Sequence, residues 1–559
     1  MSINERTSGI LLPLFSLAGY GSVGALGGAA RTFVDFLSRA GQTWWQMLPI
    51  NPIDVFHSPY SGVSAFAGES LFLDVDELGL PETLVKEVAL GVLPGNRVDY
   101  ESAQRGRKLL YREAFERFTS GCGYALFHEQ EEEFYERNRY WLDDYALFQA
   151  CADRFGTRNW SQWPKEYRRH EMAVRQVRQG QEERDVQFIR FLQLVFDVQW
   201  RQFRQYCQEK NILLLGDVPI YVGQASADTW SHPELFQMNE DGVPDRVAGV
   251  PADDFNPDGQ RWDSPLYDWQ EHARTGFDWW LKRIEHTLSR FDAVRLDHFI
   301  GFYNYYSFPA GTILGGQGHS GDSSDWLPGP RETFLDLLFD RFDRSRFIAE
   351  DLGVMNEGVH KLRDRYDLPG MNVLQFSFDN CGRTNPTLQW KENSIVCTGT
   401  HDTPPVLAWL NDLELAGPEH WTPANFAAIW HVLLQYQRDS EQVLMNFQEY
   451  PQRYGSTRDY WHYSAPLAPG EHRPVREDLL ALRQAVIRIV MNSPGKVALF
   501  PMQDLLGLDA SARTNFPGRC DGNWLWRLLP GQLTDERADE LLALTAEGNR
   551  LPVISRSTR

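Results

Sequence analysis

The sequence has no hydrophobic run approaching the roughly 18 residues that cross a membrane, and no basic segment followed by an apolar stretch opens it. We therefore expect neither a transmembrane helix nor a secretory signal. Cysteine is scarce, with six among 559 residues, and none lies in a CxxC cluster. This spacing indicates neither a zinc site nor a disulfide framework, and isolated thiols suit a cytoplasmic protein.

Positive charge is also in short supply. The chain has 55 Lys and Arg against 76 Asp and Glu, a formal net charge of −21. Such a surface repels phosphate backbones, so we do not expect a nucleic-acid partner, although a neutral ligand is unaffected. Aromatic residues are plentiful at 13%, with 19 Trp. Besides filling a core, such rings can stack on the apolar faces of sugars.

Eight short apolar runs, bounded by Gly, Pro and polar residues, predict buried parallel strands separated by helices. Alternation of strand and helix over eight units predicts a (β/α)8 TIM barrel, here a single catalytic domain over residues 1–559 without a separate C-terminal β-domain. A length of 559 residues exceeds one ordinary core, so we expect large insertions or several domains. The runs cover residues 9–17, 43–50, 211–220, 291–299, 346–353, 371–378, 393–402 and 496–504.

The spacing of these runs is uneven. Residues 70–205, rich in Glu, Arg, Gln and Leu, predict a mainly helical insertion between the second and third strands. Residues 222–290 form a second insertion after the third strand, and its middle is rich in Pro and Gly and therefore loop-like. Between the first two strands, the spacing of apolar residues predicts a helix over 30–41.

Carboxylates follow three of the predicted strands. Asp297 ends the fourth strand, Glu350 the fifth and Asp402 the seventh. The carboxyl ends of barrel strands surround the active-site mouth, so the three side chains should meet there. Any one of them could instead cap a helix or lie in a solvated loop. Delivery from three separate strands favours a catalytic cluster.

The neighbours of two carboxylates predict different roles. Arg295 lies two residues before Asp297, so both side chains leave the strand on one face. The guanidinium would keep Asp297 ionised, as a nucleophile requires, unless the pair is only structural. Glu350 follows an apolar run that would raise its pKa, as a general acid requires. One ionised and one protonated carboxylate is the arrangement of glycosidic bond cleavage.

Two other readings are weaker. Gly19, Gly21 and Gly24 make the GxGxxG pattern of dinucleotide-binding folds, but no acidic residue ends the second strand. A turn at the barrel mouth explains these glycines more simply. A metal-dependent barrel hydrolase could use His298 and His401 beside the carboxylates, yet the first strand lacks an HxH and carries no ligand at its end.

Three segments identify a resemblance: RLDHFIGF (295–302), IAEDLGV (348–354) and TGTHDT (398–403) resemble the catalytic strand ends of the amylomaltases. These enzymes are the 4-α-glucanotransferases of glycoside hydrolase family 77. The resemblance runs from residue 9 to about residue 527. Further similar segments are 44–52, 58–68, 216–230, 247–269, 370–378, 501–508 and 522–527.

The resemblance implies a cytoplasmic enzyme that moves segments of maltooligosaccharides and other α-1,4-glucans with retention, without a metal or organic cofactor. It implies that Asp297 is the nucleophile, Glu350 the general acid/base and Asp402 a stabiliser of the distorted sugar. Residues 247–262 would form a loop over the substrate. Substrate-binding roles are implied for Arg295, which would support Asp297, for His401 at the cleavage point, and for Asp217, Tyr60, Trp262 and His298, with Tyr60 and Trp262 stacking on the glucan.

The sequence departs from the family pattern at several positions. Ile300 replaces a frequent Arg, Ala25 a common Asp, and Asp254 an aromatic residue of some members, while THDTPPVLAW replaces THDND. None of these changes removes a catalytic carboxylate, but the resemblance does not define acceptor preference or the details of the subsites. Two alternatives stay open: an α-glucan hydrolase with the same carboxylates, and a glucan-binding scaffold without turnover, whose expected signature is a missing carboxylate.

Overall fold

The computed structural model describes ten stretches of the chain, and the fold is taken from these. They are residues 3–18, 22–89, 95–122, 125–177, 182–251, 259–312, 325–353, 356–377, 390–415 and 476–552.

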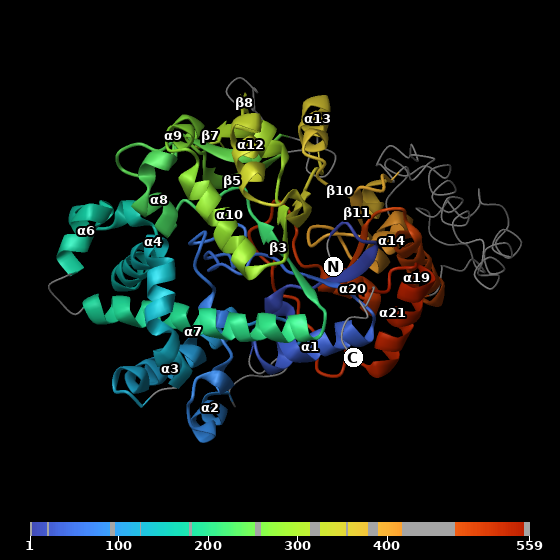
Figure 1. Ribbon diagram of the computed structural model, residues 1–559, viewed down its shortest axis with the longest axis horizontal. Coiled ribbons are helices and arrows are strands. Elements are labelled where there is room, and N and C mark those ends of the chain that lie inside the picture. The colour runs from blue at the N-terminus through green and yellow to red at the C-terminus, as the bar shows by residue number, and fades with distance from the viewer. Residues whose placement is uncertain are drawn as a thin grey trace, which may run out of the picture.

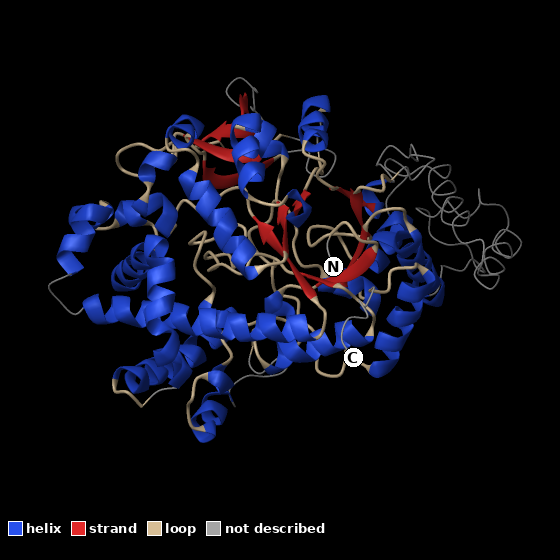
Figure 2. Cartoon of the chain, in the orientation of Figure 1, coloured by secondary structure: helices blue, strands red, loops and turns tan. Residues whose placement is uncertain are grey.

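Eight parallel strands form the centre of the molecule (Figure 2). They pair in chain order, and β12 pairs with β1, so the sheet curls back on itself. Where the ladder is interrupted, between β9 and β10, the Ala349 N–H donates to the Pro369 carbonyl at 3.0 Å. This arrangement confirms the predicted (β/α)8 barrel. The strands are β1 (Thr7–Leu11), β2 (Trp44–Gln46), β3 (Leu213–Val218), β6 (Ala293–Leu296), β9 (Phe347–Ala349), β10 (Gly370–Val373), β11 (Ser394–Cys397) and β12 (Val497–Pro501).

Alternation along the strands separates an inner from an outer core. Trp44, Leu215 and Ile348 belong to the cluster that fills the barrel, while the neighbouring Trp45 and Leu214 pack outward against the helices. Helices follow the strands along the chain, and α1 packs against both α7 and α21 (Figure 1). These helices are α1 (Gly28–Arg39), α7 (Glu182–Glu209), α10 (Asp278–Arg290), α12 (Arg331–Arg341), α13 (Glu357–Arg365), α14 (Val406–Leu415), α19 (Arg476–Asn492), α20 (Met502–Leu506) and α21 (Asp535–Glu547).

The chain between β2 and β3 forms a group of helices that extends to one side of the barrel (Figure 1). Its two longest members, α4 and α7, pack along each other through buried aromatic residues such as Phe127 and Phe191. The division of the chain into a barrel and insertions at the bounds given above stays a prediction. The helices of this group before α7 are α2 (Glu82–Ala89), α3 (Tyr100–Thr119), α4 (Ala125–Phe155), α5 (Lys165–Arg168) and α6 (His170–Val177).

A small antiparallel sheet lies beside the carboxyl ends of the barrel strands, in the order β5-β4-β7-β8 (Figure 2). The sequence had indicated a loop-like middle for residues 222–290, but two strands of this sheet lie there. The difference arises because β4 pairs with β7, more than fifty residues later in the chain. The strands are β4 (Arg246–Val250), β5 (Gln260–Pro265), β7 (Asn304–Pro309) and β8 (Asp325–Pro328); the nearby short helices are α8 (Ala227–Ser231), α9 (Trp269–Arg274) and α11 (Ile300–Tyr303).

The two ends of the described chain meet at the amino-terminal side of the barrel strands. The fully buried Arg550 donates from its guanidinium to backbone carbonyls on both sides of the seam between β1 and β12, including Thr7 at 2.9 Å and Lys496 at 3.0 Å. It also binds the Met491 carbonyl at 2.6 Å, next to the side chain of Arg6. Among the residues described, no helix combines the length and apolar character needed to cross a bilayer.

Candidate active site

Arg295 is the centre of the site. It lies on β6, and its guanidinium binds Asp217 of β3 at 2.9 Å and Asp297 at 2.6 Å. A third carboxylate, Glu350, lies 3.8 Å from the same guanidinium. The Tyr60 hydroxyl donates to Asp217 at 2.8 Å and accepts from Arg295 at 3.3 Å. One cation therefore serves three carboxylates that come from three neighbouring barrel strands.

Glu350, directly after β9, is held by two backbone donors. The His298 N–H donates to one carboxylate oxygen at 2.7 Å, and the Leu352 N–H donates to the other at 2.9 Å. His298 has a positive φ of 47°, a left-handed conformation that costs a non-glycine residue roughly 1–3 kcal/mol. This conformation accompanies the N–H bond to Glu350. The carboxylate of Glu350 is therefore fixed by the chain that carries Asp297.

Asp402 is held from a different direction. It follows β11 in a loop, and the Asn515 side chain donates to its Oδ1 at 2.6 Å. His401 lies 3.3 Å from the other oxygen of Asp402. The His401 ring stacks on the Tyr60 ring with centroids 5.0 Å apart and an angle of 10°. One face of Tyr60, which the resemblance implied for stacking on glucan, is thus covered by His401.

Trp262 and His298 lie together on the side of the small sheet. Trp262 is on β5, and its ring meets His298 edge-on with centroids 4.9 Å apart. The loop implied to cover the substrate, 247–262, includes β4 and the start of β5, but residues 252–258 with Asp254 lie outside the described residues. Gly19 and Gly21 of the GxGxxG pattern also lie outside them.

The structure corrects one electrostatic expectation. Arg295 was expected to hold the pKa of Asp297 low, but burial raises that pKa well above its ordinary value. Arg295 opposes the rise, while the negative charges of Asp217, Glu350 and Asp402 add to it. The expectation was wrong because it left out the burial of Asp297, and because Arg295 is shared with Asp217 and Glu350.

Glu350 behaves as its apolar neighbours predicted. Burial raises its pKa, although Arg295 and the two backbone N–H groups favour the ionised form. Burial also lowers the pKa of His298 to about 4 and lowers that of His401. Both imidazoles are therefore neutral at pH 7 and can accept as well as donate hydrogen bonds.

Two residues near Asp402 were not predicted as site residues. Asn515 binds the Asp402 carboxylate, and Trp524 packs near both Tyr60, at 5.9 Å, and His401, at 6.1 Å. Both lie after the last barrel strand, in a stretch without periodicity. Only the resemblance of residues 522–527 pointed to this region.

The departures from the family pattern have different surroundings. Ile300 is buried, with 4% of its surface exposed, at the start of α11. An arginine there would place a charge in the core, so the apolar residue fits its site. Ala25 is partly exposed.

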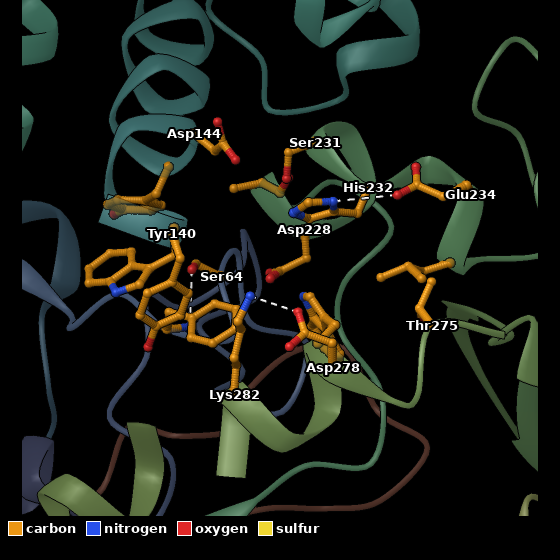
Figure 3. Close-up of a pocket in the computed structure, with 16 residues that line it drawn as sticks. Ser64, Tyr140, Asp144, Asp228, Ser231, His232, Glu234, Thr275, Asp278 and Lys282 are labelled. Carbon is orange, nitrogen blue, oxygen red and sulfur yellow. Dashed lines mark hydrogen bonds and ion pairs between the residues drawn. The ribbon is translucent and has the colours of Figure 1, made fainter. Parts of the chain in front are cut away.

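A separate cavity of about 230 Å³ lies between α4, α8 and α10 (Figure 3). Its lining includes Tyr140, Asp228 and His232, and Lys282 pairs with Asp278 there at 2.6 Å. None of the residues predicted to form the site lines it. The cavity is therefore distinct from the cluster around Arg295.

Comparison with known proteins finds relatives of this chain. A family model described as 4-alpha-glucanotransferase matches residues 12–533. A 4-alpha-glucanotransferase of Thermus thermophilus is 36% identical over 98% of this chain and 99% of its own length. A second, from Aquifex aeolicus, is 35% identical over 94% and 95%. The structure of an amylomaltase from Streptococcus agalactiae in complex with acarbose superposes with a TM-score of 0.81 at 28% identity, covering 98% of this chain and all of that one.

Proposed function

Because the chain belongs to glycoside hydrolase family 77, the 4-alpha-glucanotransferases, we infer that it transfers segments of α-1,4-glucans to the 4-hydroxyl of another glucan or of glucose. The observation that supports this activity most directly is the arrangement of three carboxylates: Asp297 and Glu350 lie at Arg295, and Asp402 is close enough for its charge to raise the pKa of Asp297. Maltooligosaccharides are the proposed substrates, in keeping with the acarbose complex of the Streptococcus agalactiae amylomaltase. We also propose a cytoplasmic location; the five described cysteines are free.

The first half of the proposed reaction forms a covalent intermediate. Asp297 attacks the anomeric carbon while Glu350 protonates the leaving glycosidic oxygen. Its raised pKa favours the protonated form that this step needs. The bond from the anomeric carbon to the leaving oxygen breaks, and a β-glucosyl ester of Asp297 forms. Arg295 balances the negative charge of Asp297 before attack.

The second half releases the glucosyl unit to an acceptor. Glu350, now ionised, takes the proton of the incoming 4-hydroxyl, and that oxygen attacks the anomeric carbon and displaces Asp297. Two inversions give net retention of the α-linkage. Asp402 stabilises the distorted sugar in both transition states by binding its hydroxyl groups. Its exposed side chain, open to 43%, leaves its carboxylate accessible to substrate.

A hydrolase would use the same carboxylates with water as acceptor. A transferase must therefore bind a sugar acceptor well enough to compete with water, which is present at about 55 M. Trp262 borders the carboxylate cluster and is only half-buried, so its ring can hold a second glucan chain by stacking. A bound acceptor also makes the attack effectively intramolecular.

The test is the product profile from pure maltotriose. Transfer breaks one α-1,4 link and makes another, so glucose and a ladder of longer maltodextrins should form while the number of reducing ends stays nearly constant. The two quantities are followed by chromatography and a reducing-sugar assay. A steady rise in reducing ends without any product longer than the donor would instead establish the hydrolase.

A further inference from the structure

The loop between β11 and α14, residues 398–405, carries His401 and Asp402. The residues that follow β12, the next strand of the barrel, hold this loop in place. Two of them, Gln503 and Asp504, lie in α20 and are almost fully buried, with 5% and 1% of their surfaces exposed. Neither was predicted as a site residue.

Asp504 binds both ends of this loop. The Thr398 hydroxyl donates to Asp504 Oδ2 at 2.5 Å, at the point where the loop leaves β11. The Val406 N–H, at the first residue of α14, donates to Asp504 Oδ1 at 2.7 Å. Burial raises the pKa of Asp504 to about 6, so at neutral pH the carboxylate is mostly ionised and both oxygens accept. One side chain thereby fixes the separation of the two ends of the loop.

Gln503 supports Asp402 through a different segment, residues 512–515. Its amide donates to the Ala512 carbonyl at 3.2 Å and to the Thr514 hydroxyl at 2.9 Å. The next residue, Asn515, donates from its side chain to Asp402 and from its backbone to the His401 carbonyl at 3.0 Å. Consecutive residues of α20 therefore hold the two segments that meet at Asp402.

We propose that Asp504 is a positioning residue that sets the place of Asp402 at the reacting sugar. Asp402 needs such support more than the other carboxylates do, because its side chain is 43% exposed, against 21% for Asp297 and 11% for Glu350. Its position therefore depends on the path of its loop. The proposal rests on the proposed function, in which Asp402 stabilises the transition state.

The main test is a double-mutant cycle with Asp504→Ala and Asp402→Ala, assayed on maltotriose and on a glucosyl fluoride. Asp504→Ala should lower kcat by on the order of 100-fold, the effect of a catalytic group misplaced by about 1 Å. Because the interaction is made in the transition state, kcat and kcat/KM should fall together. In the Asp402→Ala background, the same change should have no further effect, since it acts through Asp402.

Two further variants separate positioning from folding. Thr398→Val removes one of the two loop bonds and should give a smaller loss of kcat in the same direction. Asp292→Ala is the matched control: Asp292 accepts from the Leu214 N–H at 2.8 Å and from Arg204 at 2.9 Å, just before β6 on the opposite side of the barrel. It should lower the unfolding midpoint without lowering kcat. Asp504→Asn, which keeps an acceptor for Val406, replaces Asp504→Ala if that variant does not fold, and should show an intermediate loss.

Two results would overturn the proposal. In the first, Asp402→Ala is inactive, but Asp504→Ala, or Asp504→Asn in its place, has a kcat within twofold of wild type. This result would leave the proposed function intact. The other is a loss that persists undiminished in the Asp402→Ala background. A fully active Asp402→Ala would instead remove the role of Asp402 itself, and this proposal with it.

Discussion

At the scale of single residues, the sharing of Arg295 sets the chemistry of the site. Its guanidinium contacts Asp217 and Asp297 and lies 3.8 Å from Glu350. The buried Asp217 cannot reach solvent and keeps part of the positive charge occupied. Asp297 and Glu350 share the remainder, and burial raises the pKa of both carboxyl groups. In the proposed mechanism, the active form has Glu350 protonated and Asp297 ionised.

The nucleophile is the most direct residue to test. Asp297→Asn should keep the fold, because Asn is isosteric, and should lower turnover by several orders of magnitude, since no ester can form. In the wild type, a slow 5-fluoro glucosyl donor should leave its label on Asp297. Peptide mapping by mass spectrometry reads the position directly, and a label on Glu350 or Asp402 would contradict the assignment.

The pH dependence of the reaction tests the interaction between Asp297 and Glu350. The profile of kcat/KM should be bell-shaped, with an acid limb where Asp297 becomes ionised and an alkaline limb where Glu350 loses its proton. Glu350→Gln should remove the alkaline limb when a glucosyl fluoride, which needs little protonation, is the donor. It also removes a negative neighbour that raises the pKa of Asp297, so the acid limb should move to lower pH.

The comparison between donors supplies the control. Glu350→Gln should lose far more activity on maltotriose, whose leaving group needs a proton, than on the fluoride. Equal losses on both donors would argue against an acid role for Glu350. An acid limb that stays in place would show that Glu350 does not influence Asp297.

At the scale of elements, the sequence predicted the barrel well and its surroundings poorly. Each of the eight apolar runs overlaps one strand, because a strand buried on both faces must be apolar throughout. The sequence could place the three carboxylates because Asp297 and Glu350 follow β6 and β9 directly and Asp402 lies in the loop after β11. Their catalytic roles stay predictions. The small sheet was not found, since β4 and β7 pair across a long stretch of chain. Asn515 and Asp504 act by hydrogen bonds between distant segments, which leave no periodic pattern.

Arg550, which follows α21, contributes to the stability of the fold. Its buried guanidinium has no carboxylate within ion-pair distance among the described residues and binds the carbonyls around the β1–β12 seam. Arg550→Met should lower the free energy of unfolding by on the order of 3 kcal/mol, because several buried carbonyls lose a charged donor. Denaturant unfolding followed by tryptophan fluorescence measures this change. Arg139→Met, at a side chain that is 73% exposed, should have little effect, and equal midpoints for the two variants would contradict the role of Arg550.

At the scale of the whole molecule, the net charge of −21 bears on which partners can approach. Maltotriose is neutral, so the field of the protein does not steer it. We expect kcat/KM for maltotriose to change less than about twofold between roughly 20 mM and 500 mM NaCl, although this range spans most of the screening of surface charge. Initial rates at low substrate give the ratio. A steep salt dependence would indicate that a charged ligand or a charge-dependent change of shape controls the reaction.

The closure of the barrel by its first and last strands has a consequence for how the protein is made. β1 pairs with β12 across about 490 residues of chain, and Arg550 reaches back across 543 residues to the Thr7 carbonyl. At roughly 5–20 residues per second, the ribosome needs about 25–100 s to deliver β12 after β1 has emerged. During that time β1 has an open edge that can pair with other nascent chains. The early helical region from α2 to α7 can form meanwhile, but the seam must wait until β12 and Arg550 have been made. A chaperone that shields the edge of β1 would be most useful during this interval.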